Sequence, residues 1–402
     1  MEFGICNLSP NLQVPISSLQ SLSLTLMQNI RLNPNLLNVP LYVAGKPIEE
    51  VQEEYGLTEV VKLASNENPL GLSSIARAAF EQALAEAHHY PALGDRALRR
   101  KLAALHNAQH NATFTQDNFL TGNGISDVLR MITEAFIFDG GEMVICSATF
   151  PLYRILSAQY GGKTIAVPHK HYHHDLPAML DAITSDTRLV IFCNPNNPTG
   201  TLISRDHVEE FMARVPPHVI VVFDESYYEI VEDPRYSNAA EYIQQGRDQV
   251  LLLRGFSKVH GMANLRLGYA LGTRAMIEYL RHAQLTFNTG DPVLYAAIAA
   301  LDDRAHIEKV RALIAAEKHF LYEGLSDLDL TFIPTAANFV LLVDLPREAK
   351  YIYEALLRRG VIVRVPTGFG LPDALRVSIG THAENEKFLS ALKDVLRNTD
   401  SA

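Results

Sequence analysis

Short apolar and β-branched runs alternate with helical patterns between about residues 75 and 285. This alternation is typical of an α/β domain built on a mostly parallel sheet. Several of the runs are apolar at successive positions, which is required of strands that helices cover on both faces. The predicted strands are Asn118–Thr121, Met143–Ser147, Lys163–Val167, Leu189–Cys193, Val219–Phe223, Gln249–Arg254 and Leu267–Leu271.

A different pattern follows residue 290. One long helical pattern, Pro292 to about Leu325, precedes three strand-like runs at Asn338–Val343, Val361–Val365 and Leu375–Ile379. This predicts a smaller α+β domain, with which Leu41–Ser65 is expected to pack. The predicted division is an N-terminal extension at 1–40, an N-terminal part of the small domain at 41–75, a large domain at 76–290 and the rest of the small domain at 291–402.

Composition narrows the class of function. Of the 402 residues, 48% are hydrophobic and 20% are charged, which is typical of a soluble globular protein. The net charge of −10 provides no general basic surface for nucleic acid or an anionic membrane. An anionic ligand must therefore meet local positive groups. We expect small-molecule partners, with no nucleic acid and no membrane.

The cysteines and the N-terminus indicate the compartment. Cys6, Cys146 and Cys193 are odd in number and far apart, which fits neither a disulfide framework nor a zinc site. Residues 1–30 contain no Lys or Arg. A secretion signal or a mitochondrial presequence would contain such basic residues. We expect a cytoplasmic protein whose first 30 residues form a poorly ordered extension or drape over a second subunit.

The most informative local signal is a lysine just after a predicted strand, in Leu253-Arg254-Gly255-Phe256-Ser257-Lys258. Partial desolvation there lowers the pKa of a lysine amine, so that it can attack an aldehyde. Ser257, and Arg266 eight residues after Lys258, are placed to hold a phosphate. Taken alone, Lys258 is equally consistent with a solvated loop lysine.

Two further strand ends supply companions to Lys258. Asp224 ends a buried run and Tyr227 follows three residues later. A carboxylate there can pair with a pyridine nitrogen, and the phenol can hydrogen-bond an oxygen on the same ring. Asn197, in a loop dense in turn-forming residues, can donate an amide hydrogen to that oxygen. Each feature taken alone is also explained by ordinary turn or capping chemistry.

A glycine turn opens the predicted helix Ser126–Phe138. In Thr121-Gly122-Asn123-Gly124-Ile125-Ser126-Asp127, the amides of Ile125 and Ser126 lie at the positive end of the helix and predict a phosphate seat. The spacing is not that of a dinucleotide fingerprint, because residue 127 is Asp. Phe150, after another predicted strand, can stack on an aromatic cofactor or serve as a core aromatic.

Taken together, these stretches resemble the fold-type I pyridoxal-phosphate aminotransferases from about residue 40 to 395. The resemblance implies an α/β fold with a large and a small domain, and pyridoxal 5'-phosphate as cofactor. It implies that Lys258 bonds to the cofactor and moves protons, with Asp224 on the ring nitrogen and Tyr227 and Asn197 on the ring oxygen. It further implies phosphate binding by Ile125, Ser126, Ser257 and Arg266, stacking by Phe150, and a homodimer in which Tyr90 reaches the cofactor phosphate of the neighbouring subunit.

Other stretches resemble the bacterial histidinol-phosphate aminotransferases within that family. They are Tyr42–Glu50, Lys62–Gly71, and the segments around Arg364 and Arg376. The resemblance implies Tyr42, Asn338, Arg364 and Arg376 as substrate contacts, and two arginines suit a bidentate grip on carboxylate or phosphate. The implied reaction converts L-histidinol phosphate and 2-oxoglutarate to imidazole-acetol phosphate and L-glutamate, a step of histidine biosynthesis.

The sequence departs from that branch at three places: Leu41 precedes Tyr42 where proline is usual, Phe150 stands where tyrosine is frequent, and Gly290-Asp291-Pro292 is atypical. An aromatic or other amino-acid aminotransferase is therefore the alternative reading. A phospho-amino-acid decarboxylase and a non-catalytic cofactor sensor are the more distant alternatives.

No metal is expected, because His169, His171, His173 and His174 alternate in a connection that reads as a solvated loop.

Overall fold

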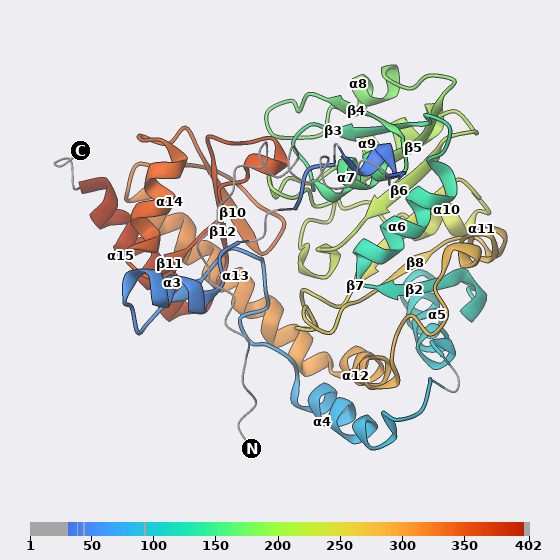
Figure 1. Cartoon of the computed structure of the whole chain (residues 1–402), viewed down its shortest axis with the longest axis horizontal. Coiled ribbons are helices and arrows are strands. Elements are labelled where there is room, and N and C mark those ends of the chain that lie inside the picture. The colour runs from blue at the N-terminus through green and yellow to red at the C-terminus, as the bar shows by residue number, and fades with distance from the viewer. Residues whose placement is uncertain (1–30, 38, 43–44, 92–93, 398–402) are drawn as a thin grey trace.

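A computed structural model describes residues 31–397, except 38, 43, 44, 92 and 93 (Figure 1). Residues 1–30, with Cys6 and the predicted extension, lie outside the described residues. Figure 1 shows a part built around a large sheet beside a smaller part that contains the C-terminal helices. Within the described residues, no helix is both long and apolar enough to cross a lipid bilayer.

The large sheet has seven strands in the order β2-β8-β7-β6-β5-β3-β4. Strand β8 is antiparallel to both its neighbours, and the other neighbouring pairs are parallel. The mostly parallel α/β sheet is therefore confirmed. The strands are β2 (Phe119–Asn123), β3 (Glu142–Cys146), β4 (Lys163–Val167), β5 (Thr187–Cys193), β6 (Ile220–Asp224), β7 (Val250–Gly255) and β8 (Leu267–Leu271).

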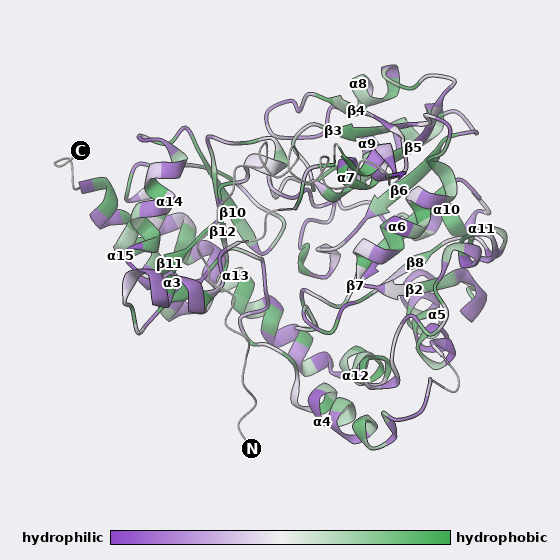
Figure 2. Cartoon of the chain, in the orientation of Figure 1, coloured by the Kyte–Doolittle hydropathy of each residue, from purple (hydrophilic) through white to green (hydrophobic). Residues whose placement is uncertain are grey.

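Successive residues of the central strands enter two different cores. On β5, Val190 and Phe192 pack into one apolar cluster, whereas Leu189 and Ile191 pack into another. Side chains of a strand alternate between its faces, so an unbroken apolar run fills both faces of a covered sheet. Figure 2 shows these strands as predominantly hydrophobic.

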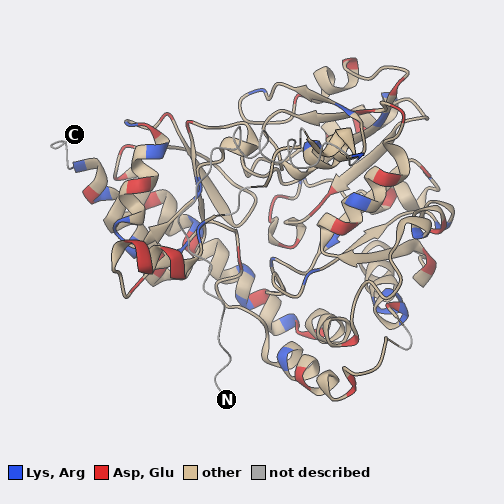
Figure 3. Ribbon diagram, in the orientation of Figure 1, with Lys and Arg blue, Asp and Glu red and all other residues tan. Residues whose placement is uncertain are grey.

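Helices flank the sheet on both faces and follow the strands along the chain (Figure 1). The α-helices are α4 (Ser74–Ala83), α5 (Arg96–His110), α6 (Ile125–Phe136), α7 (Leu152–Gln159), α8 (Leu176–Asp181), α9 (Arg205–Arg214), α10 (Ala240–Gln244), α11 (Arg274–Leu280) and α12 (Asp291–Asp302). Short 3-10 helices lie at η1 (Leu84–Glu86), η2 (Gln116–Asn118), η3 (Tyr228–Ile230) and η4 (Arg281–Ala283). Figure 3 shows acidic and basic residues side by side on these helices.

The C-terminal part has its own sheet and core. An antiparallel sheet of order β12-β10-β9 packs its buried Phe339 and Leu342 with Leu356 and Phe388 from two helices. Its elements are α13 (Arg304–Ser326), β9 (Thr331–Ile333), β10 (Phe339–Val343), α14 (Ala349–Leu357), β11 (Val361–Ile362), η5 (Thr367–Phe369), β12 (Leu375–Ser378) and α15 (His382–Arg397).

The segment before the large sheet joins this C-terminal part. Strand β1 (Val61–Lys62) pairs in parallel with β11, and Val51 of α3 (Ile48–Tyr55) packs with Leu357 and Ile362. The segment thus contacts the elements with which it was expected to pack. The short helix α2 (Pro34–Leu37) lies against α7. The exact domain boundaries stay a prediction.

Several element boundaries differ from the sequence-based ones. The helix predicted over Pro292–Leu325 is two helices, α12 and α13, because Asp303 leaves the helical conformation. Its side chain accepts a hydrogen bond from the backbone N–H of His306 at 3.0 Å, which caps the second helix. The run predicted as Val361–Val365 is a strand only at Val361–Ile362, and the short strand β9 was not predicted.

Candidate active site

A cavity of about 280 Å³ opens where β5, β6 and β7 end and α6 begins. Parallel strands place the residues that follow their carboxyl ends at one edge of the sheet, where open α/β sheets bind ligands. Two predicted site residues, Tyr90 and Asn338, are absent from its lining. The predicted residues that line it are Tyr42, Ile125, Ser126, Phe150, Asn197, Asp224, Tyr227, Ser257, Lys258, Arg266, Arg364 and Arg376.

Lys258 lies three residues beyond the end of β7 and is half-buried. Its Nζ donates a hydrogen bond to the carbonyl oxygen of Ser65 at 3.2 Å. Burial, assisted by the positive charges of Arg376 and Arg266, lowers the pKa of the Lys258 amine to about 8. Near neutral pH an appreciable fraction of this amine is therefore uncharged and nucleophilic.

Asp224 is the last residue of β6 and is only 3% exposed. One carboxylate oxygen accepts hydrogen bonds from the backbone N–H of Ser226 at 3.1 Å and its hydroxyl at 2.5 Å. The other accepts a hydrogen bond from the hydroxyl of Tyr153 at 2.7 Å. Burial raises the pKa of Asp224, while these hydrogen bonds and Lys258 act in the opposite direction.

An amide cluster surrounds the phenol of Tyr227. Its oxygen accepts hydrogen bonds from the side-chain amides of Asn66 at 3.1 Å and Asn197 at 3.2 Å. The carbonyl oxygen of Asn197 in turn accepts a hydrogen bond from Arg376 at 2.6 Å. These contacts fix the positions of three polar side chains that come from distant parts of the chain.

The first turn of α6 forms an anion-binding cradle. Gly124 precedes it with φ of +76°, a conformation that favours glycine. Strand β8 approaches this turn so closely that a Cβ on Gly268 would lie 2.5 Å from the backbone nitrogen of Ile125. Free N–H groups at a helix start, together with the guanidinium of Arg266 against Gly124, suit a phosphate.

Two arginines lie on the wall formed by the C-terminal part. Arg364 and Arg376 exchange backbone hydrogen bonds of 3.0 and 2.8 Å, which brings both side chains to the same cavity. Arg376 is 4% exposed and its Nε has no hydrogen-bond partner among the described residues. Burial is the main cause that lowers the pKa of Arg376 to about 10. A buried cation with an unused donor is suited to a carboxylate or phosphate oxygen.

Aromatic rings border the cavity. The ring of Phe150 makes an edge contact with that of Tyr42, with centroids 6.4 Å apart, and lies 6.2 Å from that of Phe369. Tyr42 is 51% exposed and still lines the cavity, so Leu41 in place of proline does not remove it from the site. Asn338 stays behind the wall, where its amide donates a hydrogen bond to the carbonyl oxygen of Asn66 at 3.1 Å.

Tyr153 and Asn66 are among the contributors to the site that were not predicted. Tyr153 belongs to the stretch that contains Phe150, and Asn66 belongs to a stretch quoted only for its resemblance. Both act on other site residues through hydrogen bonds that span 71 and 161 positions of sequence. A single sequence contains no signal for such pairings, although a positive φ of 54° at Asn66 is a common asparagine conformation.

Tyr90 lies away from the cavity. Its side chain is 76% exposed and stacks on the ring of Phe287, with centroids 4.6 Å apart. Within the described residues of one chain, Tyr90 therefore contributes nothing to the site that its own Lys258 lines.

The histidines give two results. The reading of the His169–His174 connection as a solvated loop is wrong for His174. This residue is buried, with its ring edge-on to that of Phe192, and burial lowers the pKa of His174 to about 3.

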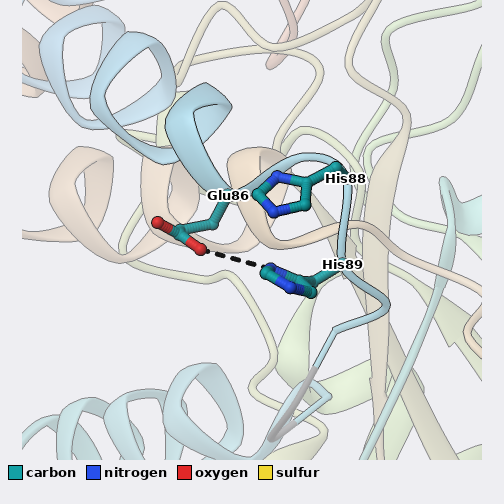
Figure 4. A group of neighbouring side chains, drawn as sticks. All are labelled: Glu86, His88 and His89. Carbon is teal, nitrogen blue, oxygen red and sulfur yellow. Dashed lines mark hydrogen bonds and ion pairs between the residues drawn. The ribbon is translucent and has the colours of Figure 1, made fainter.

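Figure 4 shows Glu86, His88 and His89, whose ligand atoms lie within 4.8 Å of one another. All three are exposed and can be satisfied by solvent, so the group does not by itself indicate a metal site.

Three comparisons with known proteins bear on this site. The family model for aminotransferase class I and II matches residues 58–392. The histidinol-phosphate aminotransferase of Moorella thermoacetica is 42% identical over 361 residues, covering 90% of this chain and 92% of that protein. The histidinol-phosphate aminotransferase of Symbiobacterium thermophilum is 42% identical over 355 residues. The match covers 88% of this chain and 96% of that protein.

A solved structure agrees with these sequence comparisons. The histidinol-phosphate aminotransferase of Sinorhizobium meliloti, in complex with pyridoxal-5'-phosphate, superposes with a TM-score of 0.83. It is 26% identical, and the match covers 92% of this chain and 98% of that one. Every residue that lines the cavity except Tyr42 and Gly45 lies inside the described span from 58 to 392 that the family model matches.

Proposed function

The chain belongs to the class I and II aminotransferase family, and we propose that it transfers an amino group between L-histidinol phosphate and 2-oxoglutarate. The products are imidazole-acetol phosphate and L-glutamate, and the step belongs to histidine biosynthesis. The observation that carries the choice of substrate is 42% identity to two relatives of that name along nine-tenths of the chain. A cytoplasmic location is part of the same proposal.

The residues present fit pyridoxal 5'-phosphate. The cavity places an amine of lowered pKa, a buried carboxylate and a helix-start cradle together, and these match an aldehyde, a ring nitrogen and a phosphate. A side chain on Gly268 would collide with the start of α6, and Ile125 and Ser126 of that first turn line the cavity. When bound, the cofactor supplies an aldehyde that bonds to amino groups and a ring that withdraws electrons from the carbon attached to nitrogen.

Each holding role follows from the chemistry of the side chain. Ile125, Ser126, Ser257 and Arg266 would hold the phosphate, and Phe150 would cover one face of the ring. Asp224 would accept the ring N–H, because a buried carboxylate keeps a neighbouring nitrogen protonated. Tyr227 and Asn197 would donate to the ring oxygen, since both are fixed at one point by their own partners.

Lys258 has the proton-moving role. As a neutral amine it can accept a proton from the substrate carbon next to nitrogen and later return it. Its pKa of about 8 favours this exchange near neutral pH, because an ordinary lysine there is almost wholly protonated. The hydrogen bond to Ser65 holds Nζ at the cavity wall.

Arg364 and Arg376 would bind the anionic end of either substrate. L-Histidinol phosphate has a phosphate and no carboxylate, whereas glutamate and 2-oxoglutarate have two carboxylates. Planar guanidinium groups accept both kinds of oxyanion, so one arginine pair can serve both half-reactions. Tyr42 at the mouth is a further proposed substrate contact, whereas Asn338, which is not part of the lining, would act on the site through its hydrogen bond to Asn66.

A homodimer is part of the proposal. Tyr90 and Phe287 form an exposed aromatic stack, with 76% and 56% of their surfaces accessible. Large exposed aromatic pairs are typical of interfaces, and a second subunit is the partner that lets Tyr90 reach a phosphate. Analytical ultracentrifugation of the wild-type chain and of Tyr90→Ala measures this directly: a wild-type chain that stays monomeric at micromolar concentration contradicts it.

The substrate is tested by product analysis. Purified enzyme with 2-oxoglutarate and either L-histidinol phosphate or L-phenylalanine should form glutamate with a kcat/KM at least about 100-fold higher for histidinol phosphate. Carbon dioxide release without consumption of 2-oxoglutarate would instead identify a decarboxylase. Equal or better turnover of phenylalanine would identify an aromatic aminotransferase.

A further inference from the structure

Several residues that line the active-site cavity are followed in the chain by polar residues that do not line it. Glu225 follows Asp224, Tyr228 follows Tyr227, and His260 lies two residues after Lys258. Glu225 and His260 are both buried, yet neither lines the active-site cavity. We call the side of these segments that faces the active-site cavity the front and the opposite side the back. Charged and polar side chains thus lie on both sides.

One contact at the back joins two neighbouring strands. Arg254 of β7 donates a hydrogen bond from Nε to Glu225 Oε2 at 2.9 Å, and its Nη2 forms an ion pair with the same oxygen at 2.8 Å. The guanidinium carbon of Arg254 also lies 3.4 Å from the ring centre of Tyr228. This pair holds the end of β6 against the end of β7, inside the regular sheet.

A second contact joins two irregular segments. His260 Nε2 lies 3.1 Å from Glu229 Oε1 in an ion-pair contact, with side chains only 5% and 11% exposed. Glu229 belongs to η3, which follows Asp224 and Tyr227, whereas His260 belongs to the turn that contains Lys258. Neither segment is in the sheet, so no strand pairing fixes their separation.

The turn that contains Lys258 is also held from the opposite side. The side-chain amide of Asn68 donates a hydrogen bond to the carbonyl oxygen of Val259 at 2.8 Å. Gly261, with φ of +68°, comes so close to the backbone of Gly71 that a Cβ would lie 2.1 Å from its oxygen. Toward Asp224 and Tyr227 the turn is held by Val259, which packs with Tyr227 in one buried apolar cluster, and by the polar contact between His260 and Glu229.

Stability alone does not explain this polar contact. Glu229 and His260 border a second cavity, of about 230 Å³, on one side, while the ring of His260 lies 5.0 Å from that of Phe256 on another. Removing a carboxylate and an imidazole from water costs free energy that the contact only roughly offsets. A well-packed apolar pair would stabilise the fold at least as well. What an apolar pair cannot supply is a fixed direction.

We propose that His260 and Glu229 are positioning residues, whose polar contact adjusts the distance between the Lys258 amine and the Asp224–Tyr227 segment beyond what the packing of Val259 on Tyr227 sets. The proposal rests on the role of Lys258 in the proposed function and not on the identity of the substrate. Without this contact we expect the turn to shift toward the second cavity or solvent, so that the amine becomes better hydrated. Its pKa then rises toward the value of an ordinary lysine.

The test uses His260→Phe, which keeps the ring volume and removes the donor, and His260→Gln, whose amide can donate from nearly the position of Nε2. The reactivity of Lys258 toward acetic anhydride is followed against pH in cofactor-free enzyme, with modified peptides quantified by mass spectrometry. His260→Phe should move the midpoint up by about one pH unit. It should also lower kcat by about 10- to 100-fold with little change in KM, because the misplaced group acts in the chemical step.

A matched control comes from the C-terminal part. His382 Nδ1 makes a hydrogen bond of 3.1 Å to Glu317, which is the same chemistry far from the site. His382→Phe should leave both the midpoint and kcat unchanged. His260→Gln should restore the wild-type midpoint and most of kcat.

Several outcomes overturn the proposal. They are an unchanged midpoint in His260→Phe, a fall in melting temperature without a shift of midpoint, or a His260→Gln enzyme as impaired as His260→Phe. If His260→Phe does not fold, Glu229→Met removes the acceptor from the other side and must give the same shift. Because the reactivity is measured without substrate, a wrong substrate assignment leaves this result intact.

Discussion

The front and the back of the same segments use polar residues in opposite ways. At the front, the carboxylate of Asp224 and the amine of Lys258 face an open cavity, and Arg376 retains an unused donor. At the back, Glu225 pairs with Arg254 and Glu229 pairs with His260, so each charge faces a protein partner and not the cavity, although Arg254 Nη1, Glu229 Oε2 and His260 Nδ1 have no hydrogen-bond partner among the described residues. The alternation of side chains along an extended segment makes both arrangements possible within a few residues.

The difference indicates what each side contributes. Groups that face the cavity with spare bonding capacity and shifted pKa values are available to a ligand. Groups that are paired behind it have no ligand to bind and hold the first set in position. Substitutions at the front should therefore reduce activity at nearly constant stability, whereas substitutions at the back should reduce stability or alignment.

The largest effect is expected for Lys258→Ala. No other described side chain in the cavity has an amine, so turnover should fall by about four orders of magnitude or more. The fold should remain, because Nζ makes one hydrogen bond to a backbone carbonyl and lies 5.6 Å from the ring centre of Tyr227, and such contacts add little net stability. Activity is measured as glutamate formation and folding by circular dichroism. Transamination at more than about 1% of wild type would contradict the assignment of Lys258.

Of the substitutions considered, loss of the Glu225–Arg254 pair should have the largest effect on stability. Arg254→Met leaves Glu225 buried without its cation and should lower the free energy of unfolding by about 3–5 kcal/mol. Urea denaturation measures the change. Arg235→Met, which breaks an exposed pair with Asp233, is the matched control and should have no measurable effect. Equal effects of the two substitutions would remove the distinction between front and back.

Asp224→Asn tests the front at constant shape. An amide cannot stabilise a protonated ring nitrogen, so kcat should fall by about 100- to 1,000-fold, the range seen when one preorganised electrostatic contact is lost. In the variant the amide oxygen can still accept from Ser226, and the amide nitrogen can donate to the hydroxyl oxygen of Tyr153, so we expect it to fold. A melting temperature near that of wild type is the control, and a kcat within about threefold would show that Asp224 has no electrostatic role.

Arg376→Lys tests geometry at constant charge. Lysine cannot reproduce the fork that donates to Asn197 and Ala64, so kcat/KM should fall by about 10- to 100-fold for both anionic substrates. Arg358→Lys, at the end of α14 and outside the cavity lining, is a suitable control. An unchanged kcat/KM would mean that Arg376 is structural only.

The smallest effect is a dependence on pH. The Lys258 amine must be neutral to react, and its pKa is lowered to about 8. The rate of cofactor incorporation into cofactor-free enzyme should therefore rise about tenfold per pH unit below that value and level off above it. Stopped-flow absorbance follows the reaction. A rate that keeps rising tenfold per unit to pH 10 would indicate an ordinary lysine.

Much of the sheet was predictable from sequence because its strands are covered on both faces. Lys163–Val167 and Leu267–Leu271 were predicted to the residue, and the other strands of the large sheet shift by one or two positions. The break at Asp303 was missed, because an aspartate inside an otherwise helical pattern does not reveal that its side chain will cap the next helix. Strand β9 has three residues, too few for a period to be recognised.

The cavity lining was also largely predictable, since residues after parallel strands converge whatever their spacing in the sequence. The supporting contacts were not. Tyr153 reaches Asp224 and His260 reaches Glu229 through tertiary geometry, and neither pairing has a periodic or local signature. Tyr90 shows a different limit, because the role proposed for it depends on a second chain.

The most direct test of the central claim is a single-turnover experiment. Enzyme loaded with pyridoxal 5'-phosphate is mixed with L-histidinol phosphate or, separately, with L-phenylalanine, and the visible absorption of the enzyme-bound cofactor is followed. We expect this absorption to be lost at least about 100-fold faster, at equal low concentrations, with histidinol phosphate. Equal rates, or a faster loss with phenylalanine, would contradict the proposed substrate while leaving the aminotransferase chemistry in place.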